Sequence, residues 1–200
     1  WQNGYYTYTC KRCDATETEN VARADYSAYD AAKDALKARL EDTTLHATVA
    51  AEINAVLTAN ALADKLIVTE QDTVTTATTA LQNEVKRVTH EYTVTYMNGE
   101  APHSTFEVMY GSTFSAPADP EKAADKQYTS IFKEWSPAKV DYVTGNVTYY
   151  AVYTETVNEY TVVFQNEDGT ELQSSEVAYG ETPVYTGETP TKEATAQYTY

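Results

Sequence analysis

An internal repeat constrains what this chain can fold into. The stretch YTVTYMNG, which begins at Tyr92, returns as YTVVFQNEDG at Tyr160, and EVMYGST at Glu107 returns as EVAYGET at Glu176. Matching residues lie roughly 70 positions apart in both pairs, and a fixed period of this kind is typical of an array of small modules. The repeat therefore predicts several modules and disfavours one large enzyme domain.

The second copy is shorter than the first. The first copy continues through Phe132, Trp135 and the strand-like VTYYAVY to Tyr153, whereas the second stops at Tyr200. We therefore expect the second copy to lack the counterparts of the last two strands, and the chain to be a segment of a longer protein.

Composition excludes two classes of partner. The 200 residues include 14 basic and 30 acidic side chains, which give a net charge of −16. Binding to a phosphate backbone needs a clustered basic face, so we expect no nucleic-acid partner. No apolar run approaches the roughly 20 residues that span a bilayer, so we expect no membrane insertion in this segment. The hydrophobic fraction of 42% is sufficient for packed cores.

Residues 1–20 contain the only two cysteines, Cys10 and Cys13, in a CxxC spacing. Such a pair supplies two of the four ligands of tetrahedral zinc, and His46, His90 and His103 are separated from it by long gaps. Two interpretations stay open: half of a metal or disulfide module, or a local structural pair. A thioredoxin-like role is disfavoured because the βαβ setting is missing. We expect weak zinc binding or none.

Between Asp25 and Val88 apolar residues recur at helical spacing in three stretches. The stripes are Tyr29, Ala32, Leu36 and Leu40; Val49, Ile53, Val56 and Leu57; and Val74, Ala77, Leu81, Val85 and Val88. A Ser27-x-x-Asp30 capping pattern precedes the first stripe, and Thr69 with Asp72 opens the third. Three amphipathic helices of this length are expected to bury one another as a small bundle.

After His90 the apolar residues alternate, which is the period of β-strands. Four strands are predicted, beginning at Tyr92, Ser104, Tyr128 and Val147. They should form a small sheet with one buried face. The link from Gly111 to Tyr128 contains two prolines, so we expect it to cross the sheet as an extended arm or to carry a short helix near residues 121–126.

Two resemblances accompany these patterns. The stretches DYSAYDAAKDALKARLED and LIVTEQDTVTTATTALQNEV, within residues 21–89, resemble the three-helix FIVAR module of extracellular bacterial proteins. The stretches YTVTYMNG, EVMYGSTFSAPADP, FKEWSP and VTGNVTYYAVY resemble the Listeria-Bacteroides repeat, also called the internalin B-repeat type, of bacterial surface proteins. The second resemblance covers residues 91–154 fully and 159–200 in part, and it implies a ubiquitin-like β-grasp fold.

The predicted fold class is therefore α+β and multidomain, with a three-helix bundle followed by small β-grasp-like repeat modules. The predicted domains are the end of a CxxC-containing module at 1–20, a FIVAR-like bundle at 21–89, a first β-grasp-like repeat at 90–157 and a partial second repeat at 158–200. Because that partial copy lacks its tryptophan strand, we expect it either to be poorly folded alone or to borrow a strand from a neighbour.

The residues show no catalytic constellation. A nucleophile needs a base beside it, and the three histidines fall in separate parts of the chain. The stretch Asn166 to Gly169 superficially suggests a calcium loop, but the alternating oxygen ligands are not completed, which favours a plain turn. Nucleotide-binding and metalloprotease motifs are missing from the sequence. We expect a protein that is not an enzyme and that carries no cofactor.

Aromatic side chains are the remaining candidates for ligand contact. Trp135, with Tyr142 and Tyr150, could stack on a sugar, although a tryptophan in so small a module is more useful as the largest side chain of a core. The leading hypothesis is a non-catalytic spacer and adhesion segment of a secreted or cell-wall-attached bacterial surface protein, monomeric within a longer chain. Its partner would be a surface ligand, either a glycan or a protein. The alternative is a set of glycan-binding or accessory modules of an extracellular carbohydrate-active enzyme.

Overall fold

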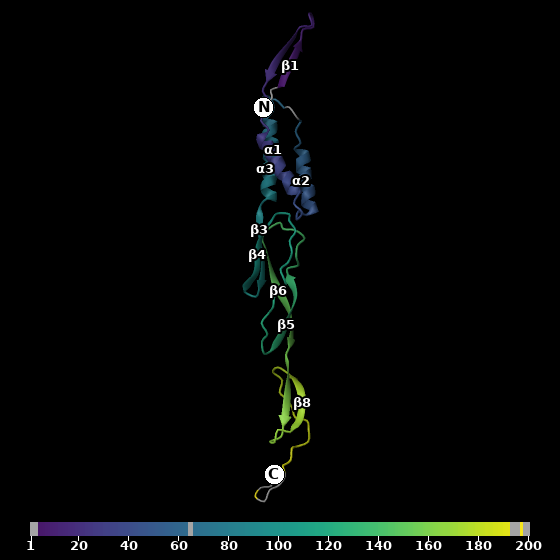
Figure 1. Ribbon diagram of the computed structural model, residues 1–200, viewed down its shortest axis with the longest axis vertical. Helices are drawn as coiled ribbons and strands as arrows, with labels where there is room; N and C mark the ends of the chain where they lie inside the picture. The colour runs from purple at the N-terminus through teal and green to yellow at the C-terminus, as the bar shows by residue number, and fades with distance from the viewer. Residues whose placement is uncertain (1–3, 64–65, 193–196, 198–200) are drawn as a thin grey trace. The chain divides into compact units, whose positions relative to one another are not determined.

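The structure is a computed structural model that describes residues 4–63, 66–192 and 197 (Figure 1). The chain divides into two compact units. The first unit contains Trp1–Pro117 and Pro137–Tyr149, and the second contains Ala118–Ser136 and Tyr150–Tyr200. Each unit is described by itself below.

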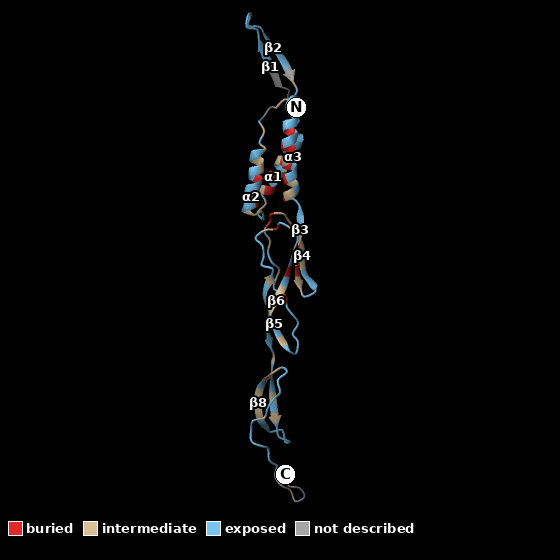
Figure 2. Ribbon diagram, turned by 180° about the vertical axis from the view of Figure 1, so that it is seen from behind, coloured by how far each residue is buried: buried red, intermediate tan, exposed pale blue. Residues whose placement is uncertain are grey.

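Three α-helices form the helical part of the first unit, α1 Ser27–Leu40, α2 Ala47–Ala59 and α3 Gln71–Val88. Their predicted stripes provide the core: Leu36, Val49, Ile53, Leu81 and Val88 are fully buried. Figure 2 shows buried residues in red along the three helices. The helical spacing of the apolar residues therefore predicted this core correctly.

The helices begin through local hydrogen bonds that differ in part from the predicted caps. The backbone N–H of Ser27 donates to Oδ1 of Asp25 at 2.8 Å, so the aspartate side chain and not the serine begins α1. At α2 the imidazole Nδ1 of His46 accepts the N–H of Thr48 at 3.3 Å. A short 3-10 helix, η1 Val68–Glu70, precedes α3.

A β-hairpin precedes the helices. Strand β1 Gly4–Thr9 pairs antiparallel with β2 Thr16–Val21, and the CxxC turn joins them. The side chains of β2 carry no apolar alternation, so its strand state follows from pairing with β1 and not from burial.

Four further strands, at the predicted positions, form one sheet in the order β4-β3-β6-β5. They are β3 Glu91–Asn98, β4 Ala101–Met109, β5 Tyr128–Ser136 and β6 Val147–Val157. In the first unit the buried hydrophobic residues of this sheet region include Val94, Tyr96, Val143 and Tyr149. The ring of Tyr96 stacks on that of Tyr149, with centroids 4.9 Å apart, and burial raises the pKa of Tyr96 to about 12.

The second unit ends in a hairpin that reproduces the first one closely. Strand β7 Glu159–Gln165 pairs with β8 Glu171–Ala178. Thr161 Oγ1 donates to Glu176 at 2.6 Å, as Thr93 Oγ1 donates to Glu107 at 2.9 Å. Both hairpins also shift register near the end of their first strand. The sequence repeat therefore becomes a structural repeat of one hairpin.

The predicted fold class, a three-helix bundle followed by β-grasp-like repeat modules, is wrong. The described residues form a mixed α/β fold with three α-helices and eight strands in three sheets. A β-grasp fold needs a helix across its sheet, but no described residue after Val88 is helical. The described link from 113 to 127 contains neither helix nor strand, and Pro117 and Pro120 disfavour both in its middle because proline lacks the backbone N–H that they use. The second copy contributes two described strands, not a module.

The helices also fail to form a separate body, since α1 and α2 contact the β3–β4 hairpin within the first unit. The helices and the first hairpin therefore belong to one compact unit. The four domain boundaries given above stay predictions. Among the described residues, no helix combines the length and apolar character that crossing a bilayer requires.

Candidate functional site

The most highly connected polar site in the first unit surrounds Arg39, whose exposed fraction is 5%. Its Nε donates to the carbonyl of Val88 at 3.1 Å, and its Nη2 donates to the carbonyl of Tyr110 at 3.0 Å. The same Nη2 lies 2.6 Å from Ser112 Oγ, and Nη1 lies 2.6 Å from Asp42 Oδ2. One guanidinium thus joins α1 to the last turn of α3 and to the end of the β3–β4 hairpin. We call these five residues the arginine junction.

A second arginine holds the same hairpin end from α3. The guanidinium of Arg87 lies over the ring of Tyr110, with its central carbon 4.6 Å from the ring centroid. Arg87 also bonds to Glu84 at 2.5 Å and to Glu52 at 3.0 Å. These carboxylates, led by the hydrogen bond to Glu84, raise the pKa of Arg87. Two cations therefore hold Tyr110, since Arg87 contacts its ring and Arg39 bonds to its carbonyl.

The backbone at this corner is as constrained as its side chains. Gly111 has a φ of +79°, and a Cβ added to it would lie 2.8 Å from Cγ1 of Val49. Its carbonyl accepts the N–H of His46 at 2.8 Å, and its N–H donates to Val143 at 2.7 Å. Only glycine satisfies both the left-handed backbone and the close approach of α2.

The hydrogen bonds of the arginine junction have a structural role. Ser112 Oγ accepts a hydrogen bond from Arg39 at 2.6 Å and lies 3.1 Å from Thr44 Oγ1, whose hydroxyl donates to Asp42. Arginine has no acceptor and cannot take a proton from a serine. The backbone and side-chain groups of Thr44 bond to Asp42 and hold the pKa of that carboxyl below its usual value, which keeps it charged beside Arg39. The arrangement fixes three elements and activates no nucleophile.

The CxxC pair occupies the turn between β1 and β2. Both thiols are free and exposed. The N–H of Asp14 donates to the carbonyl of Cys10 at 2.9 Å, and Asp14 takes a φ of +53° that closes the turn. Hydrogen bonds from the Cys13 side chain, and then from the backbone of Arg12 and Cys13, lower the pKa of Cys10. Among the described residues no group of three or more His, Cys, Asp or Glu side chains gathers as a metal site.

Trp135 lies on a partly buried aromatic face of the second unit. The register of β5 against β6 shifts between Phe132 and Glu134, so Phe132 opposes Tyr153 and Trp135 opposes Ala151. Tyr153 and Ala151 share one face of β6, and the bulge therefore puts Phe132 and Trp135 on that same face. The ring centroids of Phe132 and Trp135 are 5.3 Å apart. This packing supports the core role of the tryptophan.

The other two predicted contact residues do not join Trp135. Tyr150 is 54% exposed and opposes Ser136, so its side chain lies on the other face of the strand pair. Tyr142 belongs to the first unit, where its ring stacks on His46 at a centroid distance of 4.4 Å. Contact of these three aromatic residues with a glycan stays a prediction.

The acidic turn of the second hairpin is closed by its own residues. Asp168 Oδ1 accepts the N–H of Thr170 at 2.9 Å, and this bond lowers the pKa of Asp168. The ammonium of Lys192 lies 2.5 Å from a carboxylate oxygen of Glu167. The turn is therefore neutralised in part by a side chain of the chain itself, in agreement with the plain-turn interpretation.

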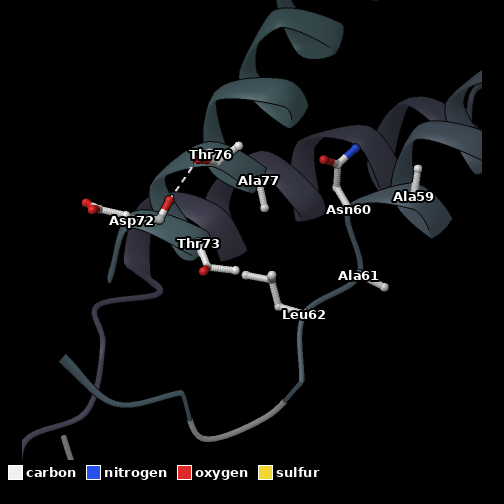
Figure 3. A pocket seen from close by; sticks show the side chains of 8 residues that line it. All are labelled: Ala59, Asn60, Ala61, Leu62, Asp72, Thr73, Thr76 and Ala77. Atoms are coloured by element: carbon white, nitrogen blue, oxygen red, sulfur yellow. Dashed lines mark hydrogen bonds between the residues drawn. The ribbon is translucent and has the colours of Figure 1, made fainter. Parts of the chain in front are cut away.

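An open depression of about 420 Å³ lies between the end of α2 and the start of α3 (Figure 3). Small side chains line it, including Ala59, Ala61 and Ala77, and Asp72 is the one acidic residue among its described lining residues. The hydroxyl of Thr76 turns away to the backbone carbonyl of Asp72 at 2.8 Å. None of the described lining residues is cationic or pairs a nucleophile with a base.

Sequence analysis missed Arg39 and Ser112. The helical spacing of Tyr29, Ala32 and Leu36 predicts that the next buried position is 39 or 40, so the burial of Arg39 was predictable. The stripe given above contains only Leu40. Ser112 carried no comparable signal. No family model, curated protein or solved structure matches this chain.

Proposed function

We propose that this chain is a non-catalytic spacer and adhesion segment of a secreted or cell-wall-attached bacterial surface protein. The observation that carries the proposal is the joint at Asn158. Strand β6 ends at Val157 and β7 begins at Glu159, so a single residue links these two strands. A spacer needs such short, fixed joints, because a flexible linker would let its parts reorient freely.

All four hydrogen-bonding groups of Asn158 are used. Its backbone N–H donates to the carbonyl of Gln127 at 2.8 Å, and its carbonyl accepts the N–H of Tyr179 at 2.8 Å. Its side-chain Nδ2 donates to Asp125 at 2.9 Å, and its Oδ1 accepts the hydroxyl of Thr129 at 2.6 Å. The joint is therefore held from β5, from β8 and from the loop before β5.

That loop is itself ordered by Asp125. The carboxylate accepts the N–H groups of Tyr128 at 2.6 Å and Gln127 at 2.7 Å, and these bonds lower the pKa of Asp125. The hydroxyl of Tyr160, at the start of β7, donates to the carbonyl of Lys126 at 2.6 Å. Residues on both sides of Asn158 are thus fixed to the same loop.

The first unit has an equivalent joint between α3 and β3. Two residues separate Val88 from Glu91, and the carbonyl of His90 accepts the N–H of Tyr110 at 2.8 Å. This bond corresponds to the one between Asn158 and Tyr179 in the repeat. The arginine junction adds the bond from Arg39 to Val88. Both joints are short, and both are bonded to the following hairpin.

Three further observations support the proposal. The net charge of −16 favours solubility of an exposed protein. The polar sites described above fix elements and activate no nucleophile. The resemblance of residues 21–89 and 91–154 to modules of bacterial surface proteins supports an extracellular location, and the partner in this proposal is a glycan or protein ligand of another surface.

Double electron–electron resonance across the joint tests the spacer function. Spin labels at Ile131 and Ser174, both exposed, are introduced with Cys10 and Cys13 changed to serine. We expect one narrow distance distribution, because Asn158 fixes β7 to β5. Asn158→Gly should broaden the distribution, since it removes two of the four bonds.

The control is Asn166→Gly, which makes the same change in the hairpin turn and away from the joint. It should leave the distribution between the labels narrow. A distribution in the unsubstituted chain as broad as that of Asn158→Gly would contradict the spacer function.

A further inference from the structure

In the first hairpin, the β3–β4 pair, a further strand lies beside β3. In the sheet order β4-β3-β6-β5, β6 pairs with the edge of β3 that β4 leaves open. Within the first unit, the N–H of Thr93 donates to Oδ1 of Asn146, just before β6, at 2.9 Å. Tyr149 of β6 stacks on Tyr96, and both rings are fully buried.

The second hairpin has the same strands but a different environment. Strands β7 and β8 form a two-stranded sheet among the described residues. Phe164 occupies the position of Tyr96 but is partly exposed, with the ring of Tyr185 5.4 Å away. Tyr160 and Val163 of β7 are 46% and 40% exposed. Val162 and Phe164 of β7 are only partly buried, whereas their counterparts Val94 and Tyr96 in β3 are fully buried.

The register of the two hairpins fixes which backbone groups of β7 face outward. Thr93 opposes Glu107, and Thr161 opposes Glu176 in the same way. The N–H of Thr93 points away from β4, toward Asn146, so the N–H of Thr161 points away from β8. In an antiparallel strand the N–H and C=O of alternate residues share a direction. Thr161 and Val163 therefore direct their N–H and C=O groups to the open edge.

We propose that the open edge of β7 is a docking site for an extended peptide strand with the pattern of β6, which adds to the hairpin as β6 adds to β3. Strand addition of this kind uses backbone hydrogen bonds for affinity and alternate side chains for specificity. The occupant carries an aromatic residue at the position of Tyr149, because that ring would cover Phe164. Its centre is uncharged, as in the segment VTYYAVY from Val147.

The charge of the site supports this choice of occupant. Glu159 begins β7, and Glu176 lies opposite Thr161, so carboxylates flank the apolar centre of the edge. An acidic strand would be repelled by them. An uncharged strand rich in tyrosine and valine can lie against the apolar part of the edge without placing like charges side by side.

The test adds a synthetic peptide of residues 145–154, GNVTYYAVYT, to the isotope-labelled full chain and follows amide resonances by nuclear magnetic resonance. We expect saturable shifts confined to β7 and to its contacts on β8. At a free peptide concentration ten times the dissociation constant, the exchange of the Thr161 and Val163 amides should slow by about tenfold.

Two variants make the test specific. Val163→Pro in the chain removes an outward N–H and leaves the hydrogen bonds to β8 in place, so it should abolish binding while the β8 resonances persist. In the peptide, Tyr149→Ser removes the ring that would cover Phe164 and should weaken binding by at least about tenfold, as expected for one buried aromatic side chain.

Each other outcome overturns the proposal. No shift at millimolar peptide, or shifts away from β7, would show that this edge does not accept such a strand. Equal affinity of the Tyr149→Ser peptide and the unsubstituted peptide would show that covering Phe164 contributes nothing to binding. Self-association of the chain without peptide, lost in Val163→Pro, would identify a second copy as the occupant in place of the proposed strand.

Discussion

Nη2 of Arg39 lies 2.6 Å from Oγ of Ser112, although 73 residues separate them in the sequence. The arginine is on α1, and the serine directly follows the glycine corner of the β3–β4 hairpin. Because the guanidinium is almost fully buried, its hydrogen bonds are little weakened by competition from water. This pair is a direct physical link between the helices and the first hairpin.

Replacing Arg39 by alanine should destabilise the first unit by about 3–5 kcal/mol, the usual cost of breaking a buried ion pair from one side. The change leaves the carbonyls of Val88 and Tyr110 and the carboxylate of Asp42 without their cation. Urea unfolding followed by the helical circular dichroism signal measures the effect.

Lys37→Ala is the control for this substitution, because Lys37 is on the same helix and pairs with Asp34 at 3.9 Å on the surface. It should change the free energy of unfolding by less than about 0.5 kcal/mol. Similar losses in the two variants would mean that the arginine junction contributes no more than a surface pair.

The two corner glycines should respond differently to alanine. Gly111 and Gly180 both have positive φ, at +79° and +88°, so each substitution costs about 1–2 kcal/mol in backbone strain. At Gly111 the new Cβ also meets Val49, which adds about 1–3 kcal/mol of overpacking. At Gly180 no described atom lies within 4 Å of the added Cβ.

Thermal unfolding of each single variant, and of Gly111→Ala with Val49→Ala, measures these contributions. The double variant should lose less stability than the two single changes predict together, since the smaller residue makes room for the new methyl group. Strict additivity would contradict the contact between Gly111 and α2.

Acid should destabilise the first unit partly through Asp42. Its pKa in the folded chain is held below the unfolded value, chiefly by the N–H and hydroxyl of Thr44. Because the pKa of Asp42 is lower in the folded chain than in the unfolded chain, its carboxylate stabilises the fold at pH values above the unfolded pKa of about 3.9. This stabilisation is lost as the pH falls through the pKa of the folded chain. The free energy of unfolding should therefore decrease below about pH 4.

Asp42→Asn should lower stability at pH 7 by about 1–3 kcal/mol and flatten this acid decrease. Asp34→Asn, at an exposed position of α1, should leave the slope unchanged. Urea titrations between pH 3 and pH 7 distinguish the two. An unchanged acid slope in Asp42→Asn would assign the acid sensitivity to other carboxylates.

Hydrogen exchange should separate the two hairpins. The amides of Val94 and Val162 occupy the same place in their ladders, but Val94 is fully buried and Val162 is partly exposed. We expect the amides of residues 159–165 to exchange at least about tenfold faster than those of β3, because fewer buried contacts oppose local opening. Equal protection would show that the second hairpin is stabilised independently of a covering strand.

Zinc should bind weakly to the monomer. Cys10 and Cys13 leave half of a tetrahedral site to water, and two thiolates alone do not hold zinc tightly. Competition with a chromophoric chelator measures the affinity, and Cys10→Ser with Cys13→Ser is the reference. Tight binding of one zinc ion per monomer would contradict this prediction.

The sequence predicted the elements that bury a regular stripe. Leu36, Val49, Ile53 and Leu81 recur at helical spacing and lie in the helical core. Val94 and Tyr96 alternate as expected for a strand with one buried face. In both cases burial itself imposes the period on the sequence, so the pattern is readable without the structure.

The remaining features depend on contacts distant in the sequence. Strand β2 has polar side chains on both faces and is a strand because β1 offers backbone partners. Arg39 is buried because acceptors from α3 and the hairpin converge on it, and no local pattern announces them. Of the two forms predicted for the link from Gly111 to Tyr128, the short helix near residues 121–126 does not form; the carboxylate of Asp125 instead accepts the N–H groups of Gln127 and Tyr128 in a turn before β5.

The joint at Asn158 also determines how the second unit would carry a mechanical load. When tension is applied along the chain, a linker of several residues would lengthen before any bond is strained. A single residue has no such slack, so the pull passes from β6 into β7 while the bonds of Asn158 to Asp125, Gln127 and Thr129 are loaded together. Bonds loaded together share the force, and the joint should therefore yield abruptly at a threshold and not creep open.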